Sequence, residues 1–192
     1  MPSKKVTDLR ALKAYAHPLR IRIDRALNAV RTATVTQLAE MVDEPVALVS
    51  YHLHKLVEYG YIEEAAPQGR DGRERWWQPA ADVFAMRWKD FSDGPEGVAA
   101  YIGAGHQVIQ ARMQSLLQYV GQQAAWPPEW ASSTFSNGRL LKLTHEELQE
   151  MSEEAAEFCD RWAARSREAQ ESSDGGDREH VELQMYGYPF KP

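Results

Sequence analysis

The stretch "TVTQLAEMVDEPVALVSYHLHKLVEYGYI", residues 34–62, decides the fold. Its first part has helical spacing, with Thr34 or Thr36 as the N-cap. The apolar side of this short helix consists of Leu38, Ala39 and Val42. After the break "DEP", Pro45 opens a second helix that Gly60 ends. The buried stripe of the second helix consists of Val49, Leu53, Leu56 and Val57.

The flanking residues extend this helix pair into a larger pattern. Upstream, Asp8 begins a helix over residues 8–15, and Pro18 suits the first turn of the next helix. Downstream, residues 61–66 and 74–79 predict two strands joined by a turn at 67–73, which makes a β-hairpin. Helices followed by a basic-tipped hairpin describe a winged helix-turn-helix. Residues 81–91 are expected to be helical.

Two histidines, His52 and His54, lie in the second helix of the pair. Residues two apart on a helix project about 200° apart, so these side chains cannot bind one metal ion together. We expect His52, beside buried Leu53, to pack against a neighbouring helix. For His54, the sequence permits either a solvated side chain or one that faces DNA, and we favour the second.

The surface that would face DNA follows by removing the buried stripe. The remaining positions of the second helix are Val46, Ala47, Ser50, Tyr51, His54 and Lys55. Short side chains near its N-terminus would let the helix enter the major groove. Thr36 and Gln37 of the preceding helix can hold phosphates. In the hairpin, the side chains expected to contact phosphates or a narrow minor groove are Arg70, Arg73 and Arg75. The alternative is a solvated turn, because Asp71 and Glu74 reduce its positive charge.

Four segments resemble the ArsR-type winged-helix repressors. They read "AHPLRIRIDRAL", "TVTQLAEMV", "VSYHLHKLVEYGYI" and "GRDGRERWWQP", and the resemblance covers about residues 8–80. It implies a homodimeric transcription regulator on an inverted-repeat operator, with a recognition helix at about 45–58 and a wing at about 66–75. The chain departs from the family at Leu48, where threonine is common, and at Pro45, which comes one position early.

Charge divides the chain into two expected domains. Residues 1–90 hold 14 basic and 12 acidic side chains, and residues 91–192 hold 8 and 16, so a polyanion favours the first part. We expect a mainly α protein with a small β component (α+β): a DNA-binding winged helix over 1–90, then a dimerisation and effector region over 91–192. In that second region the pattern is helix 98–123, strand 132–144 with a hairpin at Asn137-Gly138, helix 144–170 and strand 180–190.

One apolar stripe along the helix at 98–123 predicts assembly. The stripe consists of Val98, Ile102, Ile109, Met113, Leu116 and Val120. A stripe this regular needs an apolar partner. That partner is either the helix at 145–169, which opens with a capping box of Thr144 and Glu147, or the same helix of a second chain, and we expect a two-fold dimer through residues 95–125.

Chemistry at a metal or a catalytic centre is not indicated. The helix before the recognition helix has no cysteine, His106 has no histidine at helical distance, and Cys159 is the single cysteine. No nucleophile elbow, phosphate-binding glycine loop or H-E-x-x-H motif is present. The glutamates of 146–157 are expected to be a solvated face. Cys159 is expected to be a small buried apolar residue, with a redox switch as the alternative.

The sequence therefore favours a non-enzymatic, cofactor-free transcription regulator, a homodimeric repressor that binds double-stranded DNA. The alternative is a protein-interaction adaptor that uses the winged helix and the acidic C-terminal half. The additional residues 91–192 are either an enlarged dimer interface or a pocket for a small apolar organic effector. With no apolar run of membrane-spanning length, a cytoplasmic location and no membrane association are expected.

Overall fold

The computed structural model describes residues 3–67, 74–171 and 178–191. The chain forms two compact units, Met1–Ser133 and Thr134–Pro192, each of which is described by itself. The first unit holds a winged helix-turn-helix and a long helix, and the second is built around one helix. The expected class, mainly α with a small β component, is confirmed. The assignment of DNA binding to residues 1–90 and of dimerisation to 91–192 stays a prediction.

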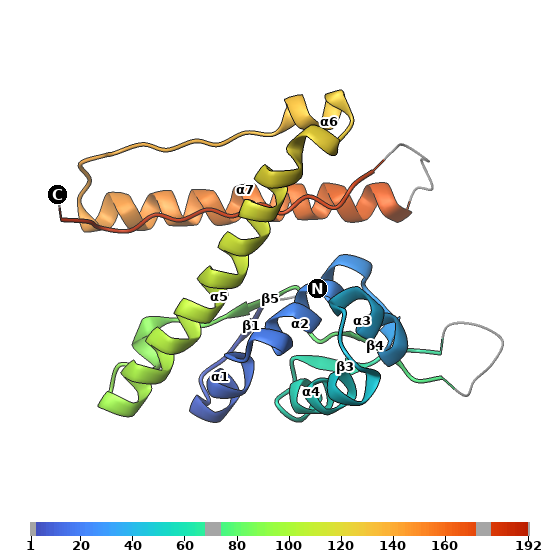
Figure 1. The fold of residues 1–192 in the computed structure, drawn as a ribbon. Helices are drawn as coiled ribbons and strands as arrows, with labels where there is room; N and C mark the ends of the chain where they lie inside the picture. The colour runs from blue at the N-terminus through green and yellow to red at the C-terminus, as the bar shows by residue number, and fades with distance from the viewer. Residues whose placement is uncertain (1–2, 68–73, 172–177, 192) are drawn as a thin grey trace. The chain divides into compact units, whose positions relative to one another are not determined.

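Four helices build the N-terminal part of the first unit (Figure 1). They are α1 (Leu9–Tyr15), α2 (Pro18–Val30), α3 (Val35–Val42) and α4 (Val46–Glu58). Asp8 caps α1 by accepting a hydrogen bond from the backbone N–H of Arg10 at 2.8 Å, and Pro18 lies in the first turn of α2, as predicted. Gly60 follows α4 with φ +70°, a conformation that glycine adopts at little cost.

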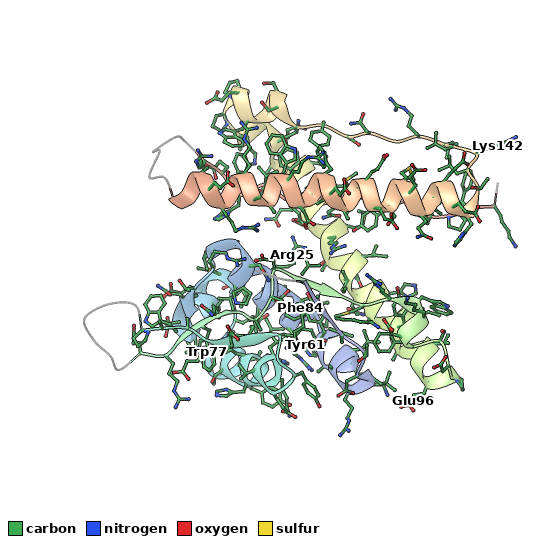
Figure 2. The ribbon with its side chains drawn as sticks, turned by 180° about the vertical axis from the view of Figure 1, so that it is seen from behind. Arg25, Tyr61, Trp77, Phe84, Glu96 and Lys142 are labelled. Atoms are coloured by element: carbon green, nitrogen blue, oxygen red, sulfur yellow. The ribbon has the colours of Figure 1, made fainter. Side chains whose placement is uncertain are left out.

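The core of the first unit lies where these helices meet the sheet. Its fully buried aliphatic side chains include Leu12, Ile23, Leu27, Leu38, Val49, Leu53 and Leu56. Val57, which was expected to be buried, is half-buried. Tyr61 donates from its hydroxyl to the carbonyl of Ala11 at 2.9 Å and meets Phe84 edge-on, with ring centroids 4.7 Å apart (Figure 2). Aromatic packing of this kind joins the helices to the strands.

A charged residue, Asp24 of α2, is buried in this core and was not anticipated from the sequence. Its carboxylate accepts hydrogen bonds from the Tyr15 hydroxyl at 2.8 Å and from the side-chain amide of Asn28 at 3.1 Å. Burial raises the pKa of Asp24 to about 6, although the two hydrogen bonds oppose the shift. The side chain therefore changes its charge near neutral pH.

The strands form two small sheets. The winged-helix sheet has the order β2-β4-β3, with β2 (Ala33–Thr34), β3 (Ile62–Glu64) and β4 (Trp76–Pro79), all antiparallel neighbours. The antiparallel pair of β3 and β4 confirms the two predicted hairpin strands, most of whose connecting turn lies outside the described residues, whereas β2 was not foreseen. In the second sheet, β1 (Ser3–Lys5) runs parallel to β5 (Val83–Ala85).

The helix expected over 81–91 is wrong. Residues 83–85 form β5, and a 3-10 turn, η1 (Trp88–Asp90), follows. The backbone N–H of Val6 donates to the carbonyl of Ala85 at 3.0 Å, and Phe84 packs on Tyr61. Pairing with the N-terminal arm and burial of Phe84 therefore outweigh the weak helical preference of this segment.

The long helix α5 (Pro95–Gln122) was predicted, although it begins three residues earlier than expected. Proline suits the first helical position because its missing N–H costs little there. The short η2 (Gln123–Ala125) and α6 (Pro128–Ser133) follow and complete the first unit. Ala100, Tyr101 and Ala104 of α5 pack on the core.

The second unit is α7 (His145–Glu171) with extended chain on both sides (Figure 1). The predicted capping box is present: Thr144 Oγ1 accepts from the Glu147 N–H at 3.2 Å, and the Thr144 N–H donates to the Glu147 carboxylate at 2.7 Å. The strands expected at 132–144, with their hairpin at Asn137-Gly138, and at 180–190 are wrong, because no described residue of this unit is in a strand.

The extended segment 178–191 instead lies along α7. Gly187 lies against Met151 and Leu148, and the Cys159 thiol lies 3.8 Å from the Met185 sulfur. Alternating side chains alone cannot make a strand, since a strand also needs a neighbouring backbone to bond. Cys159 is half-buried rather than fully buried.

Within the described ranges, none of the helices combines the length and apolar character needed to cross a lipid bilayer.

Candidate nucleic-acid interface

The turn between α3 and α4 is fixed by local backbone chemistry. Thr34, not Thr36, caps α3: its hydroxyl accepts from the Gln37 N–H at 3.3 Å, and the Gln37 side-chain oxygen accepts from the Thr34 N–H at 2.9 Å. Asp43 adopts a left-handed conformation, and the N–H of Glu44 donates to the Ala39 carbonyl at 3.1 Å. These bonds close α3 and direct the chain into α4.

Helix α4 begins without a side-chain cap. Pro45 is its N-cap residue and offers no side-chain acceptor, while the N–H groups of Leu48 and Val49 donate to the Pro45 carbonyl. The departures from the ArsR pattern at Pro45 and Leu48 thus coincide with a helix start that has no capping hydroxyl. This end of α4 is exposed, so water or a ligand can satisfy its first N–H groups.

The exposed α4 face holds the residues that the sequence analysis assigned to DNA. It consists of Val46, Ala47, Ser50, Tyr51, His54 and Lys55. Ser50 and Lys55 are half-buried, and the other four are exposed. Lys55 forms an ion pair with Glu58 at 2.7 Å, and this hydrogen bond raises the Lys55 pKa. Its charge is therefore shared with a neighbouring carboxylate.

The two histidines of α4 differ as expected. His54 is exposed, and its Nδ1 lies 2.7 Å from the Ser50 carbonyl, so Nδ1 carries the proton. Its ring also meets Trp77 of β4 edge-on, with centroids 6.1 Å apart. His52 is buried against His17, which confirms its predicted packing role. Trp77 thus contacts the ring of the exposed α4 histidine.

An open hollow of about 300 Å³ lies between the start of α3, the exposed α4 face and the root of the wing. Its lining includes Thr36, Ser50, His54, Glu74, Arg75 and Trp77. Four of the residues predicted to bind DNA, Thr36, Ser50, His54 and Arg75, therefore meet at one site although they come from three segments. Trp77 was not expected at the site, and in the sequence only its place in the predicted returning strand indicates it.

The other predicted contacts have different surroundings. Gln37 is exposed, but its side-chain oxygen is occupied by the capping box, which leaves its amide N–H groups as donors. Arg75 is exposed and immediately precedes β4. Arg70 and Arg73 lie outside the described residues.

A second open hollow, of about 390 Å³, lies between α1 and α5. Its lining includes Lys13, Ala16, Ala100 and Gly103, and an ion pair of 2.7 Å between Lys13 and Glu96 spans the two helices. The effector pocket was expected within residues 91–192, so this hollow does not test that expectation. Among the described residues, no three His, Cys, Asp or Glu side chains gather as a metal ion would require.

Comparison with known proteins identifies the helix pair. A family model described as a helix-turn-helix domain matches residues 15–64, from the end of α1 to the end of β3. No curated protein matches the chain. Together with the winged-helix fold, the family match supports a DNA-binding transcriptional regulator.

Two solved structures are similar to the chain at a low level. NadR in complex with 4-hydroxyphenylacetate is 18% identical, covers 61% of this chain and 73% of its own, and gives a TM-score of 0.35. A mutant of Lactococcus lactis ZitR in apo form is 17% identical, covers 75% of this chain and 83% of its own, and gives a TM-score of 0.31.

Proposed function

We propose that this chain is a sequence-specific repressor of the ArsR type that binds an inverted-repeat operator in double-stranded DNA as a homodimer. The observation that carries the proposal is the hollow in which Thr36, Ser50, His54 and Arg75 meet. Hydroxyl, imidazole and guanidinium groups on one outward surface match the acceptors of a phosphate backbone and of base edges.

The parts of this surface have separate roles in the proposal. The exposed α4 face enters the major groove, where Ser50, Tyr51 and His54 contact base edges. Thr36 and Gln37 at the start of α3 hold the phosphates beside the groove. In the wing, Arg75, with Arg70 and Arg73, contacts the flanking backbone or a narrow minor groove.

The exposed apolar stripe of α5 supports dimerisation through this helix. Ile102 and Ile109 are each 46% exposed, Leu116 is 49% and Val120 is 58%. This stripe lies on a different side of α5 from Ala100 and Ala104, which pack on the core. We assign it to a second copy, because a winged helix with a small positive charge gains from doubling its phosphate contacts. Half-sites would lie about one helical turn apart, at about 34–36 Å.

The proposal also places the protein in the cytoplasm and gives it neither a catalytic nor a metal-dependent role. A small apolar organic effector is proposed for the C-terminal part. The second unit exposes large apolar side chains, among them Leu140, Val181 and Tyr188. Exposed apolar surface of this extent is typical of an interface or a ligand site.

Titration of the full chain against duplex DNA at several salt concentrations tests the proposal, after enrichment of bound duplexes from a random library. We expect affinity for the enriched duplex to fall steeply with salt. Ser50→Ala and Tyr51→Ala should each lose about 1–3 kcal/mol of preference for that duplex over unrelated DNA. Ser152→Ala, at an exposed serine of α7, is the matched control for Ser50→Ala and should behave as wild type.

No enrichment of any duplex would contradict DNA binding and favour the protein-interaction adaptor. If a duplex is enriched but both α4 variants keep the wild-type preference for it over unrelated DNA, the proposal of DNA binding stands. The assignment of α4 as the recognition helix is then contradicted.

A further inference from the structure

The beginning of the exposed α4 face is apolar. Val46 is 45% exposed, Ala47 is exposed, and Tyr51 is 58% exposed. Leu48, 40% exposed, lies on the flank of the same face. Exposed aliphatic residues at the N-terminal end of a helix in a helix-turn-helix are the first to meet the base edges when that helix enters the major groove.

The same face lacks the side chains that read purines by paired hydrogen bonds. Guanine is usually read by Arg or Lys and adenine by Asn or Gln. Residues 46–55 contain no Arg, Asn or Gln, and their one lysine, Lys55, is held by Glu58 at 2.7 Å. The remaining polar groups are the hydroxyls of Ser50 and Tyr51 and the His54 imidazole, whose Nδ1 is engaged by the Ser50 carbonyl. Each of these makes a single contact rather than a paired one.

The major groove presents one apolar group, the 5-methyl of thymine. At about 100° per residue, Ala47 projects between Tyr51 and His54, near the centre of the exposed α4 face. Its side chain is short enough for the helix backbone to approach the bases closely, and Val46 flanks it toward the helix start.

We propose that Val46 and Ala47 recognise the 5-methyl groups of thymines in each operator half-site, so that methyl contact is a main determinant of sequence preference. The inference rests on the proposed function. It predicts that thymine is distinguished from a pyrimidine without the methyl group, even where every Watson–Crick and groove hydrogen bond is kept.

Replacement of thymine by deoxyuridine tests this directly, because uracil differs from thymine only by the methyl group. The enriched duplex is synthesised with deoxyuridine at one thymine at a time, and its affinity for the full chain is measured. We expect about a fourfold loss at one or two thymines per half-site, the effect of burying one methyl group, and no change at thymines elsewhere.

Variants then link each sensitive thymine to a side chain. Val46→Ala and Ala47→Gly should bind the thymine duplex more weakly and lose most of their response to deoxyuridine at one position. Ala47→Ser keeps the helix intact if glycine weakens it, and should lose the same response. Val83→Ala removes an exposed apolar group on β5, outside the helix-turn-helix, and should respond to deoxyuridine as wild type does.

Equal affinity for every deoxyuridine duplex would overturn the inference while leaving the proposed function in place. An undiminished deoxyuridine response in all three α4 variants would overturn it as well. Failure to enrich any duplex would overturn the proposed function and, with it, the inference.

Discussion

The imidazole rings of His17 and His52 pack together with their centroids 4.3 Å apart and their planes tilted by 33°, which joins the start of α2 to the buried side of α4. His17 caps α2, since its Nδ1 accepts from the Leu19 N–H at 3.2 Å. His52 is buried, and within the described structure its Nδ1 has no hydrogen-bond partner. The contact therefore positions α4 against the start of α2.

Stability should fall in mild acid because of this pair. Burial, and then the neighbouring His17 and Arg20, lower the pKa of His52, and burial lowers that of His17. At these two histidines the unfolded chain therefore binds more protons below about pH 6.5 than the folded chain does, so their contribution to the free energy of unfolding decreases as the pH falls. Denaturant unfolding from about pH 7.5 to about pH 5 should show a smaller decrease for His52→Leu than for wild type. His145→Gln, an exposed control, should follow wild type; equal pH dependence in all three would contradict the prediction.

Asp24 should have the opposite effect on the pH dependence of stability. Burial raises its pKa to about 6, so the folded chain binds the extra proton and the stabilisation is lost as the pH rises through that value. Relative to Asp24→Asn, the free energy of unfolding of wild type should decrease by on the order of 3 kcal/mol between about pH 4 and about pH 8. Unfolding of both proteins across this range measures the difference. A difference that does not vary with pH would show that Asp24 titrates as an exposed carboxyl does.

Arg75 should act on all DNA sequences alike. It is exposed at the root of the wing, where we propose a phosphate contact. Arg75→Ala should lower the affinity for the enriched duplex and for unrelated duplexes by a similar factor. It should also reduce the slope of log affinity against log salt concentration by about one. Glu74→Gln, which removes a neighbouring negative charge, should strengthen binding. An unchanged slope in Arg75→Ala would place the wing away from the phosphates.

A substitution at Met113 tests whether α5 forms the proposed dimer interface. It lies on the apolar stripe of α5 and is 38% exposed. Met113→Glu should yield folded monomers that lose operator binding, because a buried, unpaired carboxylate opposes association. Gln118→Glu places the same charge on another side of α5 and should remain dimeric. Sedimentation at micromolar concentration separates the cases: a dimeric Met113→Glu, or a monomeric wild type, would show that this stripe is not the interface.

The sequence determined the helix-turn-helix almost completely, because its signals are local. Thr34 and Gln37 form a capping box within one turn, Pro45 opens α4 and Gly60 ends it. The 3.6-residue spacing of apolar side chains then identified the buried side of α4, and with it the exposed face. The separation of buried His52 from exposed His54 follows from the same periodicity.

The tertiary structure decided what depends on a distant partner. Residues 83–85 became a strand because β1 pairs with them. Residues 180–190 alternate in hydrophobicity and yet, like 132–144, lie outside any strand in the described structure. Alternation sets which side chains share a face, but only a neighbouring backbone supplies the hydrogen bonds of a sheet.

The candidate site also depends partly on local sequence and partly on tertiary structure. Its residue types were evident from the sequence, but the meeting of Thr36, Ser50, His54 and Arg75 in one hollow was not. It requires β4 to return beside α4 and Trp77 to pack against His54. Contacts between residues far apart in the chain form only when burial of the core offsets the entropy of closing the intervening loops, and no local pattern encodes that balance.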